Sequence, residues 1–276
     1  MTEAALWRIE RPGPENFPLI VNVPHAGAIL PLAIAPKLTF AGLRVPDTDW
    51  HVDTLYDFAP AMGATLMVAT HSRIVVDLNR DPSGDALYPG ASNTEICPTS
   101  TFLNEPIYQP GLAPDREEIT ARLAQYWQPY HDQLAAEIAR IKAQHGFCIL
   151  LDAHSIISDA PRFFVGRLPD LNLGTADGNS CAASLAHAAF RLLSGAEDFT
   201  AVHNGRFKGG YITRHYGAPD KHVHALQLEM AQRCYMNETI PSPYVASRAA
   251  ALKAILNKLV EQILAWRPMP GADTKK

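Results

Sequence analysis

The stretch FCILLDA (Phe147 to Ala153) is apolar up to Asp152 and runs directly into His154 and Ser155. An apolar run of this length, without polar alternation, is typical of a strand buried on both faces of a parallel sheet. In open α/β sheets, ligands bind beyond the carboxyl ends of the strands. The stretch therefore predicts a buried central strand with polar, site-forming residues at its exit.

Strands and helices alternate on both sides of this central stretch. Strands are expected over 18–23, 64–69, 73–78 and 224–230, and helices over 47–64, 115–144, 177–193 and 242–266. Such alternation predicts an α/β fold, a three-layer sandwich with a mixed, mostly parallel sheet and helices on both faces. We expect one domain over residues 1–276.

The segment from Asn79 to about Pro114 differs from the rest, because it is rich in proline and glycine and shows little periodicity. Long loops in compact domains are usually functional or disordered. Its aromatic and apolar residues favour an ordered lid or binding loop near the active site at about 79–114.

Composition excludes several classes of partner. The 276 residues are 47% hydrophobic with a net charge of −4, which argues against nucleic acid, since phosphate binding needs a basic face. The N-terminus lacks the basic start and apolar centre of a signal peptide, and the longest apolar runs are far too short to span a membrane. Four isolated cysteines are interpreted as reduced thiols. We expect a cytoplasmic protein without membrane contact, and the sequence leaves its oligomeric state open.

Polar residues stand at three predicted strand ends. His25 follows the first strand in VNVPHAG, Asp152 and His154 close the central one, and Glu229 lies near the end of HALQLEM. A single histidine after a strand is often a hydrogen-bonded structural residue. Three such strand ends together favour a metal site.

The chemistry of these residue types is that of a hydrolase. Two histidines and one carboxylate form the usual ligand set of hydrolytic zinc and leave a fourth position for water. Zinc lowers the pKa of that water toward ~7. The predicted helix 47–64 offers Asp49 and Asp53 as further carboxylates. Glu229 suits the role of a general base, since charged residues rarely sit in apolar strands without a use.

A second cluster, THSRIVVDLNRD, holds Arg73, Asn79 and Arg80. An Asn-Arg pair at a strand exit can offer an amide and a planar fork of donors to one carboxylate. The alternative is a salt bridge at the strand edge with Asp77 or Asp81.

A third cluster, GRFKGGYITRHYG, combines glycines with cations. The glycines allow close backbone approach, and Lys208, Tyr211 and Arg214 could reach an anion or a developing oxyanion. The alternative is a glycine turn before a surface strand.

Taken together, several motifs resemble the N-formylglutamate amidohydrolase family. They are PHAG, DTDWHVDTLYDFA, SRIVVDLNRD, DAHS, KGGYITRHYG and LQLEM, in this order from about Val21 to Met236. The resemblance implies a fold similar to the zinc carboxypeptidases and the aspartoacylase group. It also implies hydrolysis of N-formyl-L-glutamate, a small anionic substrate, to formate and glutamate in histidine degradation.

The same resemblance implies roles for individual residues. The metal, expected to be zinc although cobalt or manganese would also suit, would be held by His25, Asp53 and His154, with Asp49 as the rival carboxylate. Ala28 stands where zinc carboxypeptidases carry the glutamate of their H-x-x-E pair, so the third ligand is left open.

Other residues are implied to handle the substrate and the proton. Asn79 and Arg80 resemble a pair that grips an α-carboxylate, and Glu229 matches a general base and proton shuttle. Arg73 and Arg214 are the candidates for polarising the formyl carbonyl or holding the γ-carboxylate.

Two rival functions remain open from the sequence. The same chemistry could act on an N-acetyl, N-succinyl or N-formimino amino acid or on a short peptide, because the sequence does not show the size of the acyl pocket. A binding protein that kept the fold and lost catalysis is the rival from another class.

Overall fold

The computed structural model describes residues 4–14, 16–85, 93–239 and 242–268. Its centre is a seven-stranded sheet in the order β1-β3-β2-β4-β7-β5-β6. The strands are β1 (Trp7–Glu10), β2 (Leu19–Val23), β3 (Thr65–Ala69), β4 (Cys148–Ile156), β5 (Leu171–Gly174), β6 (Ala201–His203) and β7 (Val223–Ala231).

The four central strands β3, β2, β4 and β7 run parallel to one another. Strand β1 pairs antiparallel with β3 at one edge, and β5 pairs antiparallel with β7 toward the other. Because the central strands share one direction, their carboxyl ends meet at one edge of the sheet, where ligands bind in such folds.

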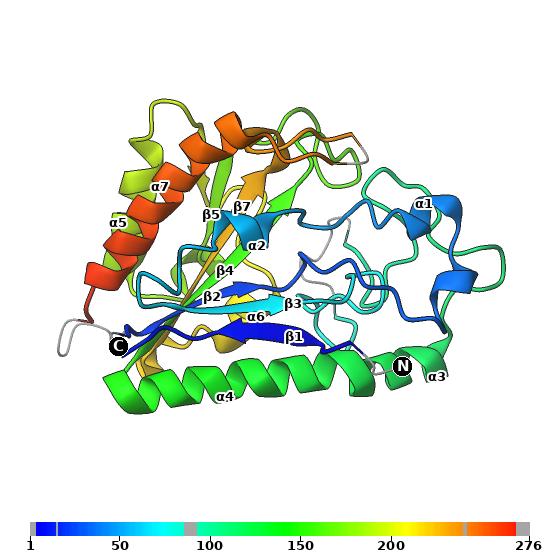
Figure 1. Cartoon of the computed structure of the whole chain (residues 1–276), viewed down its shortest axis with the longest axis horizontal. Helices are drawn as coiled ribbons and strands as arrows, with labels where there is room; N and C mark the ends of the chain where they lie inside the picture. Colours follow the sequence, from blue (N-terminus) through cyan, green and yellow to red (C-terminus); the bar gives the residue numbers. More distant parts are fainter. Residues whose placement is uncertain (1–3, 15, 86–92, 240–241, 269–276) are drawn as a thin grey trace.

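Helices cover both faces of the sheet, which confirms the predicted α/β sandwich. Figure 1 shows α5 (Ala183–Ser194) and α7 (Ala246–Ala265) on one side and α4 (Gln128–His145) along the other. Alternate residues of the buried strands enter the two cores: Val21 packs with the α5 and α7 side, and Ile20 with the α4 side. Such two-sided burial explains why the central strands are apolar throughout.

The long helix expected over 115–144 is confirmed, with an irregular turn inside it. Asp115 caps its start by accepting a bond from the backbone of Glu118, and Gly146 ends it with φ of 82°. Helix α3 (Arg116–Arg122) passes through a π-helical turn, Leu123–Trp127, into α4. None of the described helices is long and apolar enough to cross a membrane.

The prediction of a strand over 73–78 is wrong, because this segment forms turns. Its backbone carbonyls are bonded by side chains rather than by a neighbouring strand: Arg122 donates to the carbonyls of Ile74 and Val75. The apolar run therefore reflects burial, and its polar members Arg73 and Asp77 are buried with it.

Of the helix expected over 47–64, the structure contains one turn, α2 (Val52–Leu55). His51, just before it, has a left-handed backbone with φ of 62°, which a continuous helix cannot contain. Two other short helices, α1 (Phe40–Leu43) and α6 (Tyr211–Tyr216), and the strands β1, β5 and β6 were not foreseen.

The long loop expected at about 79–114 contains no helix or strand in its described parts, 79–85 and 93–114. The stretch 86–92 lies outside the described residues. Turns and isolated bridges organise the rest, such as the pairing of Leu38 with Tyr108.

Candidate metal centre and its pocket

Three buried side chains converge at the carboxyl edge of the sheet. His25 follows β2, His154 lies in β4, and Asp49 comes from the turn before α2. Each offers a ligand atom, and these atoms all lie within 4.8 Å of one another. Asp49 Oδ2 is 3.0 Å from Nδ1 of His154 and 3.8 Å from Nδ1 of His25.

The outer nitrogen of each histidine is held by a second carboxylate. His25 Nε2 lies 2.8 Å from Asp77 Oδ1, and His154 Nε2 lies 2.9 Å from Asp152 Oδ2. A carboxylate partner keeps the proton on Nε2, so the lone pair of Nδ1 faces the centre. This carboxylate–histidine arrangement is the one that orients metal-binding histidines.

One atom at the centre indicates that the donor set fits a cation. Within the described part of the chain, His25 Nδ1 is buried and has no hydrogen-bond partner. Buried polar atoms are normally paired, so an unpaired acceptor inside the cluster of His25, Asp49 and His154 suits a positive partner. Two imidazoles and one carboxylate suit zinc and related divalent metals.

The pKa shifts describe the metal-free state. Burial, helped by the nearby Arg73, lowers the pKa of His25, which keeps it neutral as a ligand must be. Burial also opposes a charge on His154, but Asp152 and Asp49 outweigh it and raise the pKa of His154 well above its ordinary value. A metal would therefore displace a proton from His154, which makes its binding pH-dependent.

Of the two carboxylates left open by the sequence, the structure brings Asp49 to the histidines. Asp53 lies in α2, and its Oδ2 accepts a bond of 2.6 Å from Arg8 at the surface. The left-handed turn at His51 separates the directions of the two carboxylates. The expectation that Asp53 completes the cluster is therefore corrected.

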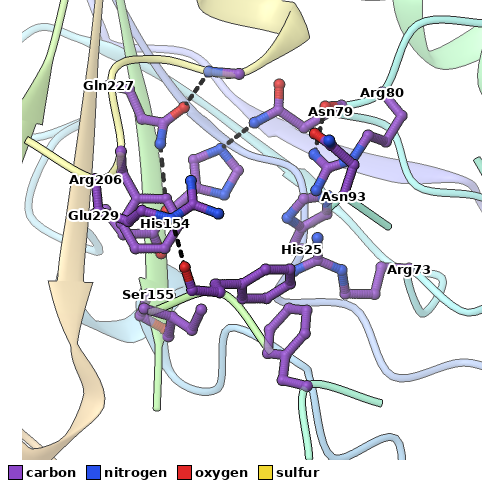
Figure 2. Close-up of a pocket in the computed structure, with 15 residues that line it drawn as sticks. His25, Arg73, Asn79, Arg80, Asn93, His154, Ser155, Arg206, Gln227 and Glu229 are labelled. Carbon is purple, nitrogen blue, oxygen red and sulfur yellow. Dashed lines mark hydrogen bonds between the residues drawn. The ribbon is translucent and has the colours of Figure 1, made fainter. Parts of the chain in front are cut away.

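A pocket lies beside this centre, and its empty space, with the open solvent at its mouth included, is about 540 Å³. Figure 2 shows that it draws on distant parts of the chain, with Arg73 and Arg80 on one side of the view and Arg206 and Glu229 on the other. Three rings complete its wall: Phe102, Phe163 and Phe207.

Glu229 lies in β7 directly opposite His154 in the strand register. Its Oε2 accepts a 3.2 Å bond from Gln227, whose Oε1 in turn accepts a 2.7 Å bond from the backbone N–H of Gly210. Burial raises the pKa of Glu229 to about 8. A carboxyl with such a pKa can both accept and return a proton near neutral pH.

Arg73 is buried against the two carboxylates behind the centre. Its Nη2 donates to Asp77 at 2.6 Å, and its Nη1 lies 3.7 Å from Asp49. Its guanidinium stacks 5.0 Å from the ring centroid of Phe102. The salt bridge to Asp77, which the sequence offered as the alternative to a binding role, is thus present, and Arg73 lines the pocket as well.

Asn79 and Arg80 both line the pocket, but the Asn79 amide is committed to the protein. Its Oδ1 accepts from the N–H of Ile212 at 2.8 Å, and its Nδ2 lies 3.0 Å from His154 Nε2 and 3.5 Å from Asp152 Oδ2. Because the Nε2–H of His154 donates its hydrogen bond to Asp152, we interpret the Asn79 amide as a donor to Asp152 as well.

Arg80 is anchored by backbone carbonyls. Nη1 donates to Asn79 O at 2.9 Å, and Nε donates to Thr94 O at 3.3 Å. These two carbonyls orient the guanidinium of Arg80.

The three side chains expected from the glycine motif lie elsewhere. Lys208 pairs with Asp177 at 3.1 Å, Tyr211 stacks on His215, and the exposed Arg214 donates to Gly209 O. Among the described residues that line the pocket, this motif contributes Arg206, Phe207 and the backbone at Gly210. A side chain there would collide with Asn79, because an added Cβ would lie 2.2 Å from its Nδ2.

Sequence reasoning missed several residues of the site. Asp77 left a signal as the one polar residue of the apolar run 74–78, and Gln227 left a weaker one beside His224 and Glu229 in 223–231. Arg206 stands in the cluster GRFKGGYITRHYG, where Lys208, Tyr211 and Arg214 were the expected contacts instead, and the edge strand β6 before it was not foreseen.

Comparison with known proteins identifies the family. A model of the N-formylglutamate amidohydrolase family matches residues 17–236, most of the chain. The chain belongs to the N-formylglutamate amidohydrolase family. Among its relatives is the N-formylglutamate deformylase of Pseudomonas aeruginosa, 47% identical over 251 residues, which cover 91% of this chain and 94% of the relative. The enzyme of the same name from Pseudomonas putida is 46% identical over the same coverage.

Solved structures of similar fold agree with this family assignment. The crystal structure of N-formylglutamate amidohydrolase from Ralstonia eutropha JMP134 superposes with a TM-score of 0.78 and 26% identity, covering 94% of this chain and 98% of that one. A protein from Agrobacterium tumefaciens shares the fold, with a TM-score of 0.73 and 20% identity over 95% of this chain and 96% of that one.

Proposed function

We propose that this member of the N-formylglutamate amidohydrolase family hydrolyses N-formyl-L-glutamate to formate and L-glutamate. The names of the two Pseudomonas relatives support the reaction and the substrate. The observation that carries the proposal is the buried cluster of His25, Asp49 and His154, with Glu229 beside it in the strand register.

His25 and His154 would hold a divalent metal through Nδ1, and Asp49 through its carboxylate. The ligand set favours zinc, which would polarise a carbonyl and lower the pKa of a bound water. The outer carboxylates Asp77 and Asp152 keep both histidine rings in place for this purpose. Zinc as the native metal stays a prediction.

Glu229 is the proposed proton carrier. It accepts a proton from the attacking water as the new bond to the formyl carbon forms. It then delivers that proton to the glutamate nitrogen as the carbon–nitrogen bond breaks, so that formic acid and a neutral amine form, and the acid then gives its remaining proton to the amine or the solvent. Gln227 orients its carboxylate for both transfers.

The arginines near the centre handle negative charge. Arg73 places a buried cation in the wall, where it would stabilise the oxyanion that develops on the formyl oxygen. Arg80 is proposed to bind the α-carboxylate with its guanidinium fork, and Asn79 to hold the backbone and Asp152 behind it. The cytoplasmic location expected from the sequence also stays a prediction.

The test is a comparison of acyl groups on one amino acid. Formate release from N-formyl-L-glutamate should exceed turnover of N-acetyl- and N-formimino-L-glutamate by at least about tenfold in kcat/KM. Faster turnover of another N-acyl amino acid would keep the chemistry and replace the substrate. Binding of N-formyl-L-glutamate without turnover, in zinc-loaded protein, would favour the binding-protein alternative.

A further inference from the structure

The turn that carries Asp49 lies outside the regular structure. Residues 48 and 49 belong to no helix or strand, and His51, two residues further on, has a left-handed backbone. Thr48 and Asp49 are nevertheless buried, with an exposed fraction of 1% each. Backbone carbonyls in such a buried segment need hydrogen-bond donors from elsewhere in the chain. The groups that supply these donors therefore decide where the Asp49 carboxylate lies.

Two side chains bond to the carbonyls on either side of Asp49. Gln232 Nε2 donates to Thr48 O at 3.0 Å. The Tyr235 hydroxyl donates to Trp50 O at 2.8 Å. Both side chains are buried, so these bonds form in surroundings where hydrogen bonds are stronger than in water. Together they fix the backbone one residue before and one residue after the proposed ligand.

A third side chain, Ser155, joins these two. Its Oγ lies 3.4 Å from Gln232 Nε2 and 2.7 Å from the hydroxyl oxygen of Tyr235. The Tyr235 hydroxyl has one hydrogen, and it gives this hydrogen to Trp50 O, because a carbonyl can only accept. Ser155 therefore donates to Tyr235 and accepts from Gln232. The three side chains form one network in which each hydrogen has a defined acceptor.

The network also contacts the Asp49 carboxylate itself. The backbone N–H of Ser155 donates to Asp49 Oδ2 at 3.1 Å. Ser155 follows His154 in β4, and Gln232 follows the end of β7, the strand that contains Glu229. Figure 2 shows Ser155 on the same side of the pocket as Glu229. The carboxyl ends of these two strands therefore supply a histidine, the proposed proton carrier and the bonds that hold Asp49.

We infer that Gln232, Ser155 and Tyr235 are positioning residues of the metal centre, an inference that rests on the proposed metal-dependent function. They act through Asp49, because they hold its turn against the ends of β4 and β7 and so keep its carboxylate beside the two histidines. A ligand that is already in place loses less freedom when a metal binds. The network therefore raises the affinity of the centre for its metal.

The test measures the zinc affinity of variants that lack parts of the network, by competition with a chelating indicator well below their melting temperatures. Y235F deletes the hydroxyl and should raise the Kd for zinc about 10- to 100-fold, the usual effect of losing a group that orients a ligand. Q232M deletes the donor to Thr48 O and should raise the Kd at least about fivefold. If Y235F does not fold, Q232M decides the question.

The matched control is Y216F. The Tyr216 hydroxyl also bonds to a backbone carbonyl and a side chain, His131 O at 3.1 Å and His131 Nδ1 at 3.0 Å, on the α4 side of the sheet. Y216F should lower the melting temperature of the metal-free protein and leave the Kd for zinc unchanged. Unchanged zinc affinity in both Y235F and Q232M, with lowered melting temperatures, would overturn the inference, because the network would then support the fold alone.

A double-mutant cycle tests whether Tyr235 acts through Asp49. In D49N, the carboxylate that the network places is absent. Adding Y235F to D49N should therefore weaken zinc binding much less than Y235F does in the unmodified chain. An equal loss of affinity in both backgrounds would contradict the inference.

Zinc titration needs no substrate, so it separates this inference from the proposed reaction. If the zinc-loaded protein releases no formate from N-formyl-L-glutamate, the deformylase proposal fails, and the zinc affinities still decide the role of the network. An unmodified chain that binds no zinc would overturn the inference itself.

Discussion

Each histidine of the candidate metal centre is held in its orientation by a carboxylate on its outer side. Asp77 and Asp152 hold the Nε2 atoms of His25 and His154, which turns both Nδ1 atoms toward Asp49. The centre is therefore set by five residues, although the sequence made only the histidines and the choice between Asp49 and Asp53 visible as ligands.

Substitution of the two rival carboxylates distinguishes their roles. D49N should remove the carboxylate charge from the proposed ligand set. Bound zinc should therefore fall well below one per chain, and the rate of formate release should fall at least about 100-fold. D53N removes only a surface pair with Arg8, and such pairs contribute little. Metal content by plasma mass spectrometry and initial rates check both. Loss of metal in D53N with full metal in D49N would reverse the assignment.

Glu229 should leave a signature in both rate and stability. E229Q should lower kcat by about 10²- to 10⁴-fold, the range for a lost general base. The native protein, in which burial raises the pKa of Glu229 to about 8, keeps a proton that the unfolded chain releases above about 4.5. The stability that Glu229 contributes is therefore present below pH 4.5 and is lost as the pH rises to 8.

The amide of E229Q cannot ionise, so the variant avoids this loss. In metal-free protein, E229Q should melt at least roughly 3 °C above the unmodified chain at pH 8 and within about 1 °C of it at pH 5. Scanning calorimetry at the two pH values measures the difference. If the unmodified chain melted at a higher temperature than E229Q at pH 8, Glu229 would be ionised there without destabilising the native protein.

At the scale of elements, the π-helical turn Leu123–Trp127 and the start of α4 each direct one side chain to the backbone of residues 78–80. Trp127 donates from Nε1 to Arg80 O at 3.2 Å, and His131 Nε2 lies 2.9 Å from Leu78 O. The two rings stack with centroids 3.8 Å apart. Such turns often mark functional sites, and this one fixes the backbone on both sides of Asn79.

Loosening this hold should affect substrate placement more than chemistry. W127F removes the bond to Arg80 O and should raise KM for N-formyl-L-glutamate about three- to tenfold, with kcat within about twofold. W266F is the matched control. The Trp266 indole donates a 3.1 Å hydrogen bond to Ser184, and this bond lies away from the pocket. Both should cost about 1 kcal/mol of stability. An equal rise of KM in both variants would refute a specific role of the π-helical turn.

The elements that the sequence predicted well are those whose apolar pattern had one cause. Strands β2, β3, β4 and β7 are buried on both faces, and the continuous helix from α3 to α4 has clear end signals at Asp115 and Gly146. The apolar run over 73–78 had another cause, burial of an irregular segment under Arg122, and a pattern of hydrophobicity does not separate the two.

At the scale of the whole molecule, the parallel arrangement of β2, β4 and β7 assembles the candidate site. It brings His25, His154 and Glu229 to one edge, as the polar residues at the strand ends predicted. The partners that come from turns and loops, Asp49 and Arg206, could not be assigned in this way. Their positions depend on a left-handed turn and on an unforeseen edge strand, which local sequence does not specify.

A metal that binds only the native chain should also stabilise the whole fold. Zinc added to metal-free protein at about 100 times its Kd should raise the melting temperature by roughly 5 °C or more. D49N should show little of this rise, whereas D53N should show all of it. An equal rise in D49N would place the stabilising zinc at another site.

The most direct measurement is formate release from N-formyl-L-glutamate by the purified protein before chelation, after chelation and after zinc is restored. The account predicts release that falls at least about 100-fold on chelation and returns with about one zinc per chain. Full activity after complete removal of metal, or no formate release from the zinc-loaded protein, would contradict it.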